Sequence, residues 1–113
     1  MERVGQVENN ERTKKKQMSD DIIFIGAKPF MNYVTAVVMM VTIKKLKEIK
    51  IIARGKVISK AVDVVEVTRN NFLKGEHEVD IKDIKIASEK FERKEDNKPI
   101  NVSTIEIILL KKE

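Results

Sequence analysis

The 113-residue chain has no cysteine and no tryptophan, and only one histidine, one tyrosine and two prolines. Without cysteine it can form neither a disulfide nor a thiolate metal site. The single histidine, His77, lies in the polar stretch 74–78, where no second histidine or cysteine can join it as a ligand. We therefore interpret His77 as a loop residue, and we expect no metal and no cofactor.

Long hydrophobic runs are also missing. The most apolar segment, 33–43, is shorter than the roughly 20 residues that a membrane-spanning helix needs. The polar residues at the start of the chain show no apolar core of a signal peptide, so we expect a soluble protein of the cytoplasm.

Motifs of the common nucleotide-dependent enzymes are absent. Neither GxxxxGK[ST] nor GxGxxG occurs, and the nearby carboxylates, such as Asp63 and Glu66, show no convergent pairing. We expect that the chain is not an enzyme. A small enzyme that relies on carboxylates and a pure protein-interaction module remain as alternatives.

Positive charge is plentiful and unevenly distributed. The net charge is +5, but residues 1–21 are balanced and residues 73–113 carry one more acid than base. The segment 22–72 has nine lysines and arginines against three acids, so it holds the entire excess. Such an uneven distribution of positive charge is typical of a protein that binds a polyanion. The Lys- and Glu-rich composition with few glutamines also suggests a hot growth temperature.

Two glycine turns lie in this basic segment, and each precedes a predicted helix. The turn 26–29 carries Lys28, and the turn 54–56 carries Arg54 and Lys56. A helix start has partial positive charge and unpaired N–H groups, so an acid or a capping side chain is favoured there. Neither turn supplies one, which indicates that the counter-charge comes from outside, most simply from phosphate.

The hydrophobic pattern predicts one α/β domain of two layers, an α+β sandwich with the order β-α-β-α-β-β. Residues 1–19 show no apolar periodicity and are predicted to form a disordered arm, with the domain at 20–113. Because parallel crossovers are right-handed, both glycine turns should lie at one sheet edge. The predicted strands are 22–25, 48–53, 84–91 and 101–111, and the predicted helices are 30–43 and 57–72.

Several faces are predicted in more detail. The helix 30–43 is apolar almost all round, so we expect the sheet on one side and another partner on a second side. In the helix 57–72, the helical period places Ile58, Ala61, Val62, Val65 and Phe72 on the face toward the sheet. Val64 and Val67 widen this stripe, and we interpret the surplus as a protein interface, with packing in the core as the alternative for Val64, Val67 and Phe72. A phase slip near Asp83 predicts a β-bulge or a late strand start there. Apolar residues on both faces of 101–111 predict a covered central strand or a dimer contact.

Three segments resemble the Alba family of small archaeal chromatin proteins: 23–34, 53–66 and 102–107. The resemblance implies a fold like the C-terminal domain of bacterial translation initiation factor 3. It also implies dimers that bind double-stranded DNA and RNA with little sequence preference and that coat and compact the chromosome in the nucleoid. A role in RNA maintenance or as a ribonucleoprotein subunit is the alternative. Heterodimers with a related chain remain open.

The resemblance also implies roles for individual residues. Lys28 matches a lysine over the nucleic-acid backbone at the dimer centre, and Phe72 matches an apolar residue at which dimers meet side by side. Ala27 departs from the family pattern of two consecutive lysines, so regulation by modification at that position is unsupported. For Asn32 and Tyr33, capping or core packing is the alternative to RNA contact, and for the hairpin tip the alternative is a solvated neutral loop. The expected nucleic-acid contacts are Lys28, Asn32, Tyr33, Arg54, Lys56, Lys60, Arg93, Lys94 and Lys98.

Overall fold

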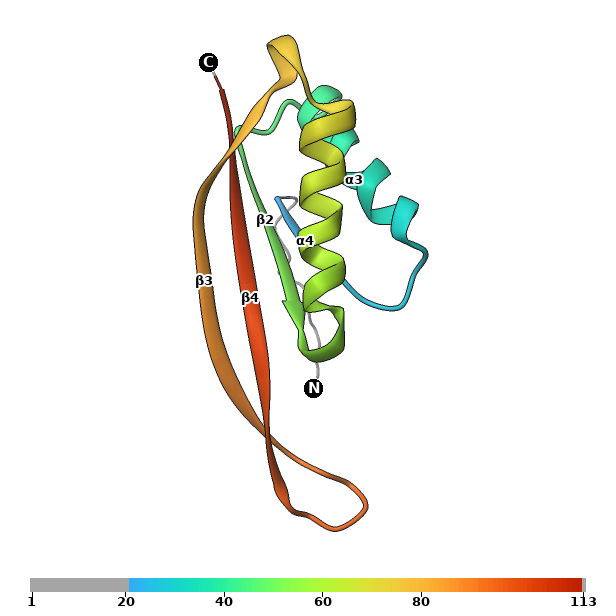
Figure 1. Ribbon diagram of the computed structural model, residues 1–113, viewed down its shortest axis with the longest axis vertical. Coiled ribbons are helices and arrows are strands. Elements are labelled where there is room, and N and C mark those ends of the chain that lie inside the picture. The colour runs from blue at the N-terminus through green and yellow to red at the C-terminus, as the bar shows by residue number, and fades with distance from the viewer. Residues whose placement is uncertain (1–20, 113) are drawn as a thin grey trace, which may run out of the picture.

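A computed structural model describes residues 21–112, in which four strands and two helices follow one another in the predicted order (Figure 1). The predicted arm 1–19 lies outside the described residues. Short 3₁₀ turns at Gly55–Val57 (η1) and Gly75–His77 (η3) and a π-turn at Thr68–Phe72 (η2) connect the main elements. The main elements are β1 (Ile22–Phe24), α3 (Phe30–Thr42), β2 (Glu48–Arg54), α4 (Ile58–Val67), β3 (Val79–Glu92) and β4 (Pro99–Lys111).

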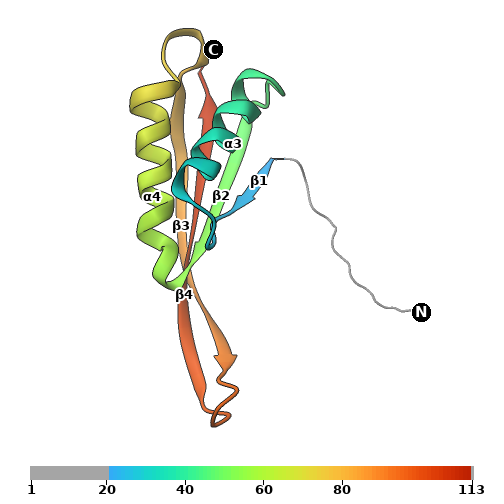
Figure 2. The ribbon, with the colours of Figure 1, turned by 90° about the vertical axis from the view of Figure 1, so that its right-hand side faces the viewer.

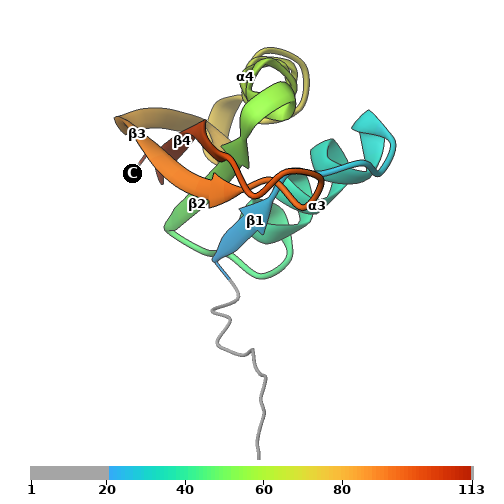
Figure 3. The ribbon, with the colours of Figure 1, turned by 90° about the horizontal axis from the view of Figure 1, so that it is seen from below.

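The sheet has the strand order β1-β2-β4-β3. Strands β1 and β2 run parallel, and the other pairs are antiparallel. Both helices cover one face of this sheet, which gives the two predicted layers (Figure 3). The order also confirms that β4 is a central strand, because it lies between β2 and β3.

The core lies between this sheet face and the helices. Alternate residues of β2 and β4 are opposite one another and point inward, as the two-residue period of a strand requires. Burying each such aliphatic side chain contributes about 1.5–3 kcal/mol. The inward residues of the two strands are Ile49, Ile51, Ala53, Ile105, Ile107 and Leu109, and the helices contribute Val34, Val37, Val41, Ala61, Val64 and Val65.

The face of α4 that meets the sheet differs from the prediction. Ala61, Val64 and Val65 are buried there, together with Thr68, whose hydroxyl donates a hydrogen bond to the Val64 carbonyl. Val62 is exposed, so its predicted place in the core is wrong. For Val64 the structure decides against the interface and for the alternative of core packing, because its side chain is completely buried.

The exposed position of Phe72 excludes the core stripe as its place and leaves its predicted role at an interface as a prediction. The π-turn η2 adds a residue to the last turn, and the Leu73 N–H donates to the Thr68 carbonyl at 2.9 Å. Leu73 is buried, whereas Phe72 is 48% exposed. Phe72 therefore lies on the surface rather than in the core stripe that the helical period predicted.

The first strand is shorter and less buried than predicted. It covers Ile22–Phe24, and only Ile23 has a buried side chain within it. Phe24 is 55% exposed, because it points to the sheet face that the helices do not cover. The expectation of a buried strand 22–25 thus holds for Ile23 and Ile25 only.

Strands β3 and β4 form a hairpin that extends well past the helices (Figure 2). Strand β3 starts at Val79, earlier than the predicted residue 84, and the register shift between Ile81 and Asp83 confirms the bulge rather than the late strand start. At about 3.4 Å per residue, the 14 residues of β3 account for most of the 50 Å length of the molecule. No helix within residues 21–112 is long and apolar enough to cross a membrane.

Candidate nucleic-acid interface

The two glycine turns lie next to each other, as predicted. Strands β1 and β2 are parallel neighbours, with Phe24 opposite Ile52, so their carboxyl ends meet at the same edge of the sheet. The Ile25 N–H continues the pairing by donating to the Ile52 carbonyl at 2.9 Å. Lys28 therefore shares this edge with Arg54 and Lys56.

Tyr33 holds the first turn in place from the start of α3. Its ring is buried, and its hydroxyl oxygen accepts the N–H groups of Gly26 (2.9 Å) and Lys28 (3.1 Å). Because the ring is buried, Tyr33 cannot act as an exposed stacking platform. Of the two alternatives for this residue, the structure favours core packing and capping of the turn.

Lys60 holds the same turn from α4. Its ammonium group donates to the carbonyl oxygens of Gly26 (2.8 Å) and Lys28 (2.6 Å). It also lies 5.2 Å from the centre of the Tyr33 ring, where a cation is attracted to the ring face. Two of its three donors are thus used inside the protein. Lys60 positions the turn, and nucleic-acid contact through its remaining donor stays a prediction.

Tyr33 and Lys60 together bind the N–H and carbonyl groups of Gly26 and Lys28, and none of these bonds uses the Lys28 side chain. Lys28 is exposed, and no ion pair joins it to an acidic side chain of residues 21–112. Helix α3 has no side-chain cap and no acid in its first turn, as predicted. The exposed Asn32 lies in the first turn of α3, next to this edge. The edge therefore offers a cation beside a helix start with unpaired N–H groups.

The second turn requires Gly55, whose φ of +58° is unfavourable for residues with a side chain. Helix α4 likewise starts without a side-chain cap or an acid in its first turn. Lys56 is exposed and has no ion pair among residues 21–112. This turn therefore presents Lys56 at the same edge as Lys28.

Arg54 corrects the expectation that the counter-charges all come from outside the chain. Its Nε lies 3.2 Å from the Glu89 carboxylate on β3, and the two side chains are 55% and 44% exposed. Exposed ion pairs contribute about 0–1 kcal/mol, so a phosphate can compete with Glu89 for the guanidinium.

The hairpin tip carries the remaining predicted residues and lies beyond the edge of the sheet where the turns are found (Figure 2). Arg93 pairs with Asp96 at 3.1 Å, and the other Asp96 oxygen accepts the Lys98 N–H at 3.1 Å. These bonds shape the tip and offset one of its cations. Lys94 and Lys98 have no ion pair within the described part of the chain. The structure thus groups Lys28, Arg54, Lys56 and Lys60, and it places Arg93, Lys94 and Lys98 apart from them.

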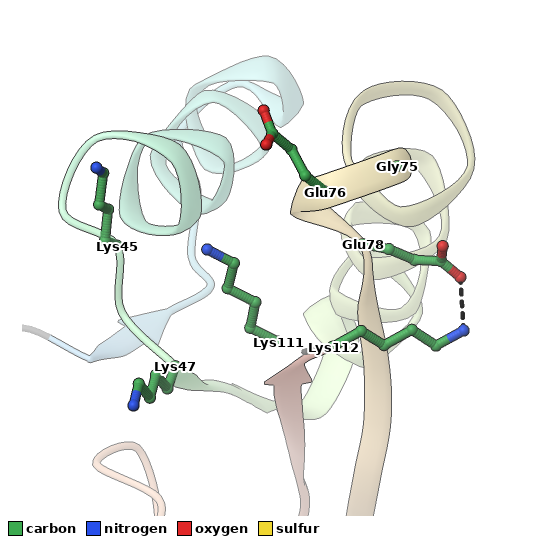
Figure 4. A pocket seen from close by; sticks show the side chains of 7 residues that line it. All are labelled: Lys45, Lys47, Gly75, Glu76, Glu78, Lys111 and Lys112. Carbon is green, nitrogen blue, oxygen red and sulfur yellow. Dashed lines mark hydrogen bonds and ion pairs between the residues drawn. The ribbon is translucent and has the colours of Figure 1, made fainter.

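A second basic hollow, which the sequence analysis missed, lies at the opposite end of the sheet (Figure 4). In the sequence, this hollow is indicated only by the lysine pairs that follow α3 and end β4. Lys112 forms an ion pair with Glu78 at 2.7 Å, and this hydrogen bond lowers the pKa of Glu78 and raises that of Lys112. The residues that line this hollow are Lys45, Lys47, Gly75, Glu76, Glu78, Lys111 and Lys112. Glu76 and Glu78 offset part of its positive charge. No group of acids and histidines able to hold a metal ion occurs among residues 21–112.

Removal of the Tyr33 hydroxyl tests how firmly the first turn is held. The Tyr33→Phe variant leaves two backbone N–H groups without their acceptor, so the free energy of unfolding should fall by about 1–3 kcal/mol in urea titrations. Thr42→Val is the matched control, because the Thr42 hydroxyl only donates to the Val38 carbonyl of its own helix. Equal stability of Tyr33→Phe and the wild type would contradict the role of Tyr33 in holding the turn.

Comparison with known proteins agrees with this architecture. The sequence model of the Alba family matches residues 21–88. The DNA/RNA-binding protein Alba of Methanothrix thermoacetophila is 50% identical over 90 residues, which are 80% of this chain and 94% of that protein. DNA/RNA-binding protein Alba 1 of Archaeoglobus fulgidus is 46% identical over 95 residues, 84% of this chain and 100% of that protein.

Solved structures give the same result. Alba from Thermoplasma volcanium superposes with a TM-score of 0.70 at 43% identity, covering 80% of this chain and 99% of that one. ALBA1 from Trypanosoma brucei shares the fold with a TM-score of 0.66 at 20% identity, covering 86% of this chain and 74% of that one. With the order of elements, the two glycine turns and these matches, the chain belongs to the Alba family.

Proposed function

We propose that this protein binds double-stranded DNA and RNA through the phosphate backbone, with little reading of base sequence. The observation that carries the proposal is the pair of exposed lysines, Lys28 and Lys56, at one sheet edge without an acidic partner among residues 21–112. The names of its relatives, DNA/RNA-binding proteins Alba, support the same activity. The proposal assigns no catalytic role, and it places the protein on the chromosome, which it coats and compacts.

Helix α3 supports the proposal that the protein acts as a homodimer. Its 13 residues include no charged side chain, although one side of the helix faces solvent in the single chain. Met31 and Met39 are 50% and 45% exposed on that side, and Thr35 lies between them. An apolar stripe of this kind can meet its own copy across a two-fold axis. Because Lys28 precedes α3, the contact would bring two Lys28 turns to the centre of one binding surface.

Phe72 offers a second contact, between neighbouring dimers on one duplex. Its exposed ring lies on η2, which follows α4. We expect Phe72→Ala to bind a short duplex, which holds one dimer, as tightly as the wild type. On long DNA the same variant should bind with less cooperativity, measured as the steepness of the titration curve. Unchanged cooperativity would remove Phe72 from this role.

Fluorescence anisotropy with 16-bp DNA and RNA duplexes of matched sequence, across a salt series, tests the proposed function. Each contacted phosphate releases counterions, so the logarithm of the binding constant should fall with slope about −0.9 per phosphate against the logarithm of the salt concentration. Similar affinities for the two duplexes support a general chromosome coat, whereas a clear RNA preference supports the role in RNA maintenance. A flat slope or no binding would contradict the proposal.

A further inference from the structure

Phe24 is an exposed aromatic residue immediately before the Gly26 turn. It ends β1 and lies opposite Ile52 on the sheet face that the helices leave open, with 55% of its surface exposed. An aromatic side chain is a large apolar group to leave in water, and burying it would gain about 1.5–3 kcal/mol. The ring is therefore available for contact with a partner.

Two hollows border Phe24. The first, about 560 Å³ in volume, lies between β1 and α3, and Lys28, Asn32 and Thr35 line it together with Phe24. Among residues 21–112, no acidic side chain lines it. The second lies on the open sheet face, where Arg54 and Lys85 are offset by Glu89 and Glu106. A ligand that touches Phe24 thus meets a net positive charge on the Lys28 side, which favours an anionic occupant with a flat apolar part.

We propose that Phe24 stacks against an unpaired nucleobase, so that the protein also binds single-stranded nucleic acid at this edge. The inference rests on the proposed function, because Lys28 holds the flanking phosphate and the Asn32 amide can hydrogen-bond the base edge. Every base has a π-face, so stacking is insensitive to sequence. In a duplex the bases are already stacked and paired, so Phe24 adds affinity for single strands only.

A second copy of the chain is a less suitable occupant of this hollow. A subunit contact here would take the Lys28 ammonium and the Asn32 amide out of water, and burying such groups without partners is costly. A contact through the exposed methionines of α3 carries less of this penalty, because of its residues only Thr35 also lines the hollow. Phosphate and base edge, by contrast, satisfy both polar groups.

A tryptophan reporter tests the stacking directly. The chain has no tryptophan, so in the Phe24→Trp variant all tryptophan fluorescence reports on this position. Titration with oligo(dT) and oligo(U) should quench the emission saturably, and a 16-bp duplex should quench it little. Emission that is already blue-shifted without nucleic acid and shifts to the red on dilution would show that a second copy covers the ring, which overturns the proposal.

Affinity measurements give an independent result. Phe24→Leu keeps the apolar bulk but removes the π-face, so the affinity for single strands should fall about 5- to 150-fold while duplex affinity stays unchanged. Phe91→Ala is the matched control, since Phe91 is 42% exposed on the hairpin and lines neither hollow. Equal single-strand affinity of Phe24→Leu and the wild type would overturn the stacking and leave duplex binding standing. Failure of the wild type to bind any duplex would instead contradict the proposed function.

Discussion

Replacement of Lys28 by glutamate should weaken binding to DNA duplexes by roughly 10- to 1,000-fold at low salt, and by the same factor for every sequence. Two unit charges 4 Å apart interact by about 1 kcal/mol in bulk water, so each reversal changes the interaction by about 2 kcal/mol. A dimer carries two such reversals, and each 1.4 kcal/mol corresponds to a factor of ten in affinity. Screening by salt brings the effect toward the lower end of this range.

The matched control for Lys28→Glu is Lys74→Glu, an identical charge change at an exposed lysine beside the hollow at the other end of the sheet. It should change the affinity by less than about threefold, because its distance from the binding edge exceeds the Debye length of about 10 Å at 0.1 M salt. The milder Lys28→Gln variant should lower the salt slope by about two per dimer. Loss of affinity for some sequences only would indicate that Lys28 reads bases rather than phosphates.

The common edge of the two turns could be predicted from sequence because it depends on local signals and one general rule. Each turn follows a short apolar run and precedes a helix, and right-handed parallel crossovers then bring the carboxyl ends of both strands together. The bulge near Asp83 could be predicted for a similar reason. A strand has a period of two, so a single slip in its pattern shows in the sequence itself.

The contacts that hold the edge in place could not be predicted in this way. Lys60 lies 34 positions after Gly26, and Glu89 lies 35 positions after Arg54. No sequence spacing shows that such distant residues meet, because their contact depends on how α4 and β3 pack around the edge. The consequence is that two predicted nucleic-acid contacts, Lys60 and Arg54, have partners inside the protein.

The hydrophobic periodicity of the sequence also could not show which faces of the apolar segments are buried. Helix α4 has valines on several sides, so more than one stripe fits a helical repeat, and the packing angle selects Val64 over Val62 for the core. Strand β1 spans three residues that are all apolar, so alternation cannot distinguish the buried Ile23 from the exposed Phe24. Phe24, which carries the proposed single-strand binding, therefore lies in a segment that the sequence predicts to be buried.

The Met39→Lys variant should be a monomer at concentrations where the wild type is a dimer. Met39 lies on the exposed side of α3, and a two-fold contact would place two lysines against each other in an apolar interface. We expect sedimentation velocity and light scattering to give the monomer mass of about 13.0 kDa. The fold itself should persist, because the side chain is 45% exposed in the single chain.

Loss of the dimer should also weaken duplex binding far more than one added positive charge could strengthen it. A monomer brings one Lys28 turn to the backbone, whereas in a dimer the second turn binds as an intramolecular event, which can raise the overall affinity by about 10²- to 10⁴-fold. The matched control is Val62→Lys, which places the same charge on the exposed side of α4 and should remain a dimer with unchanged affinity. A Met39→Lys protein that stays dimeric would show that the two copies meet elsewhere, and Lys28 would then lose its place at the centre of the binding surface.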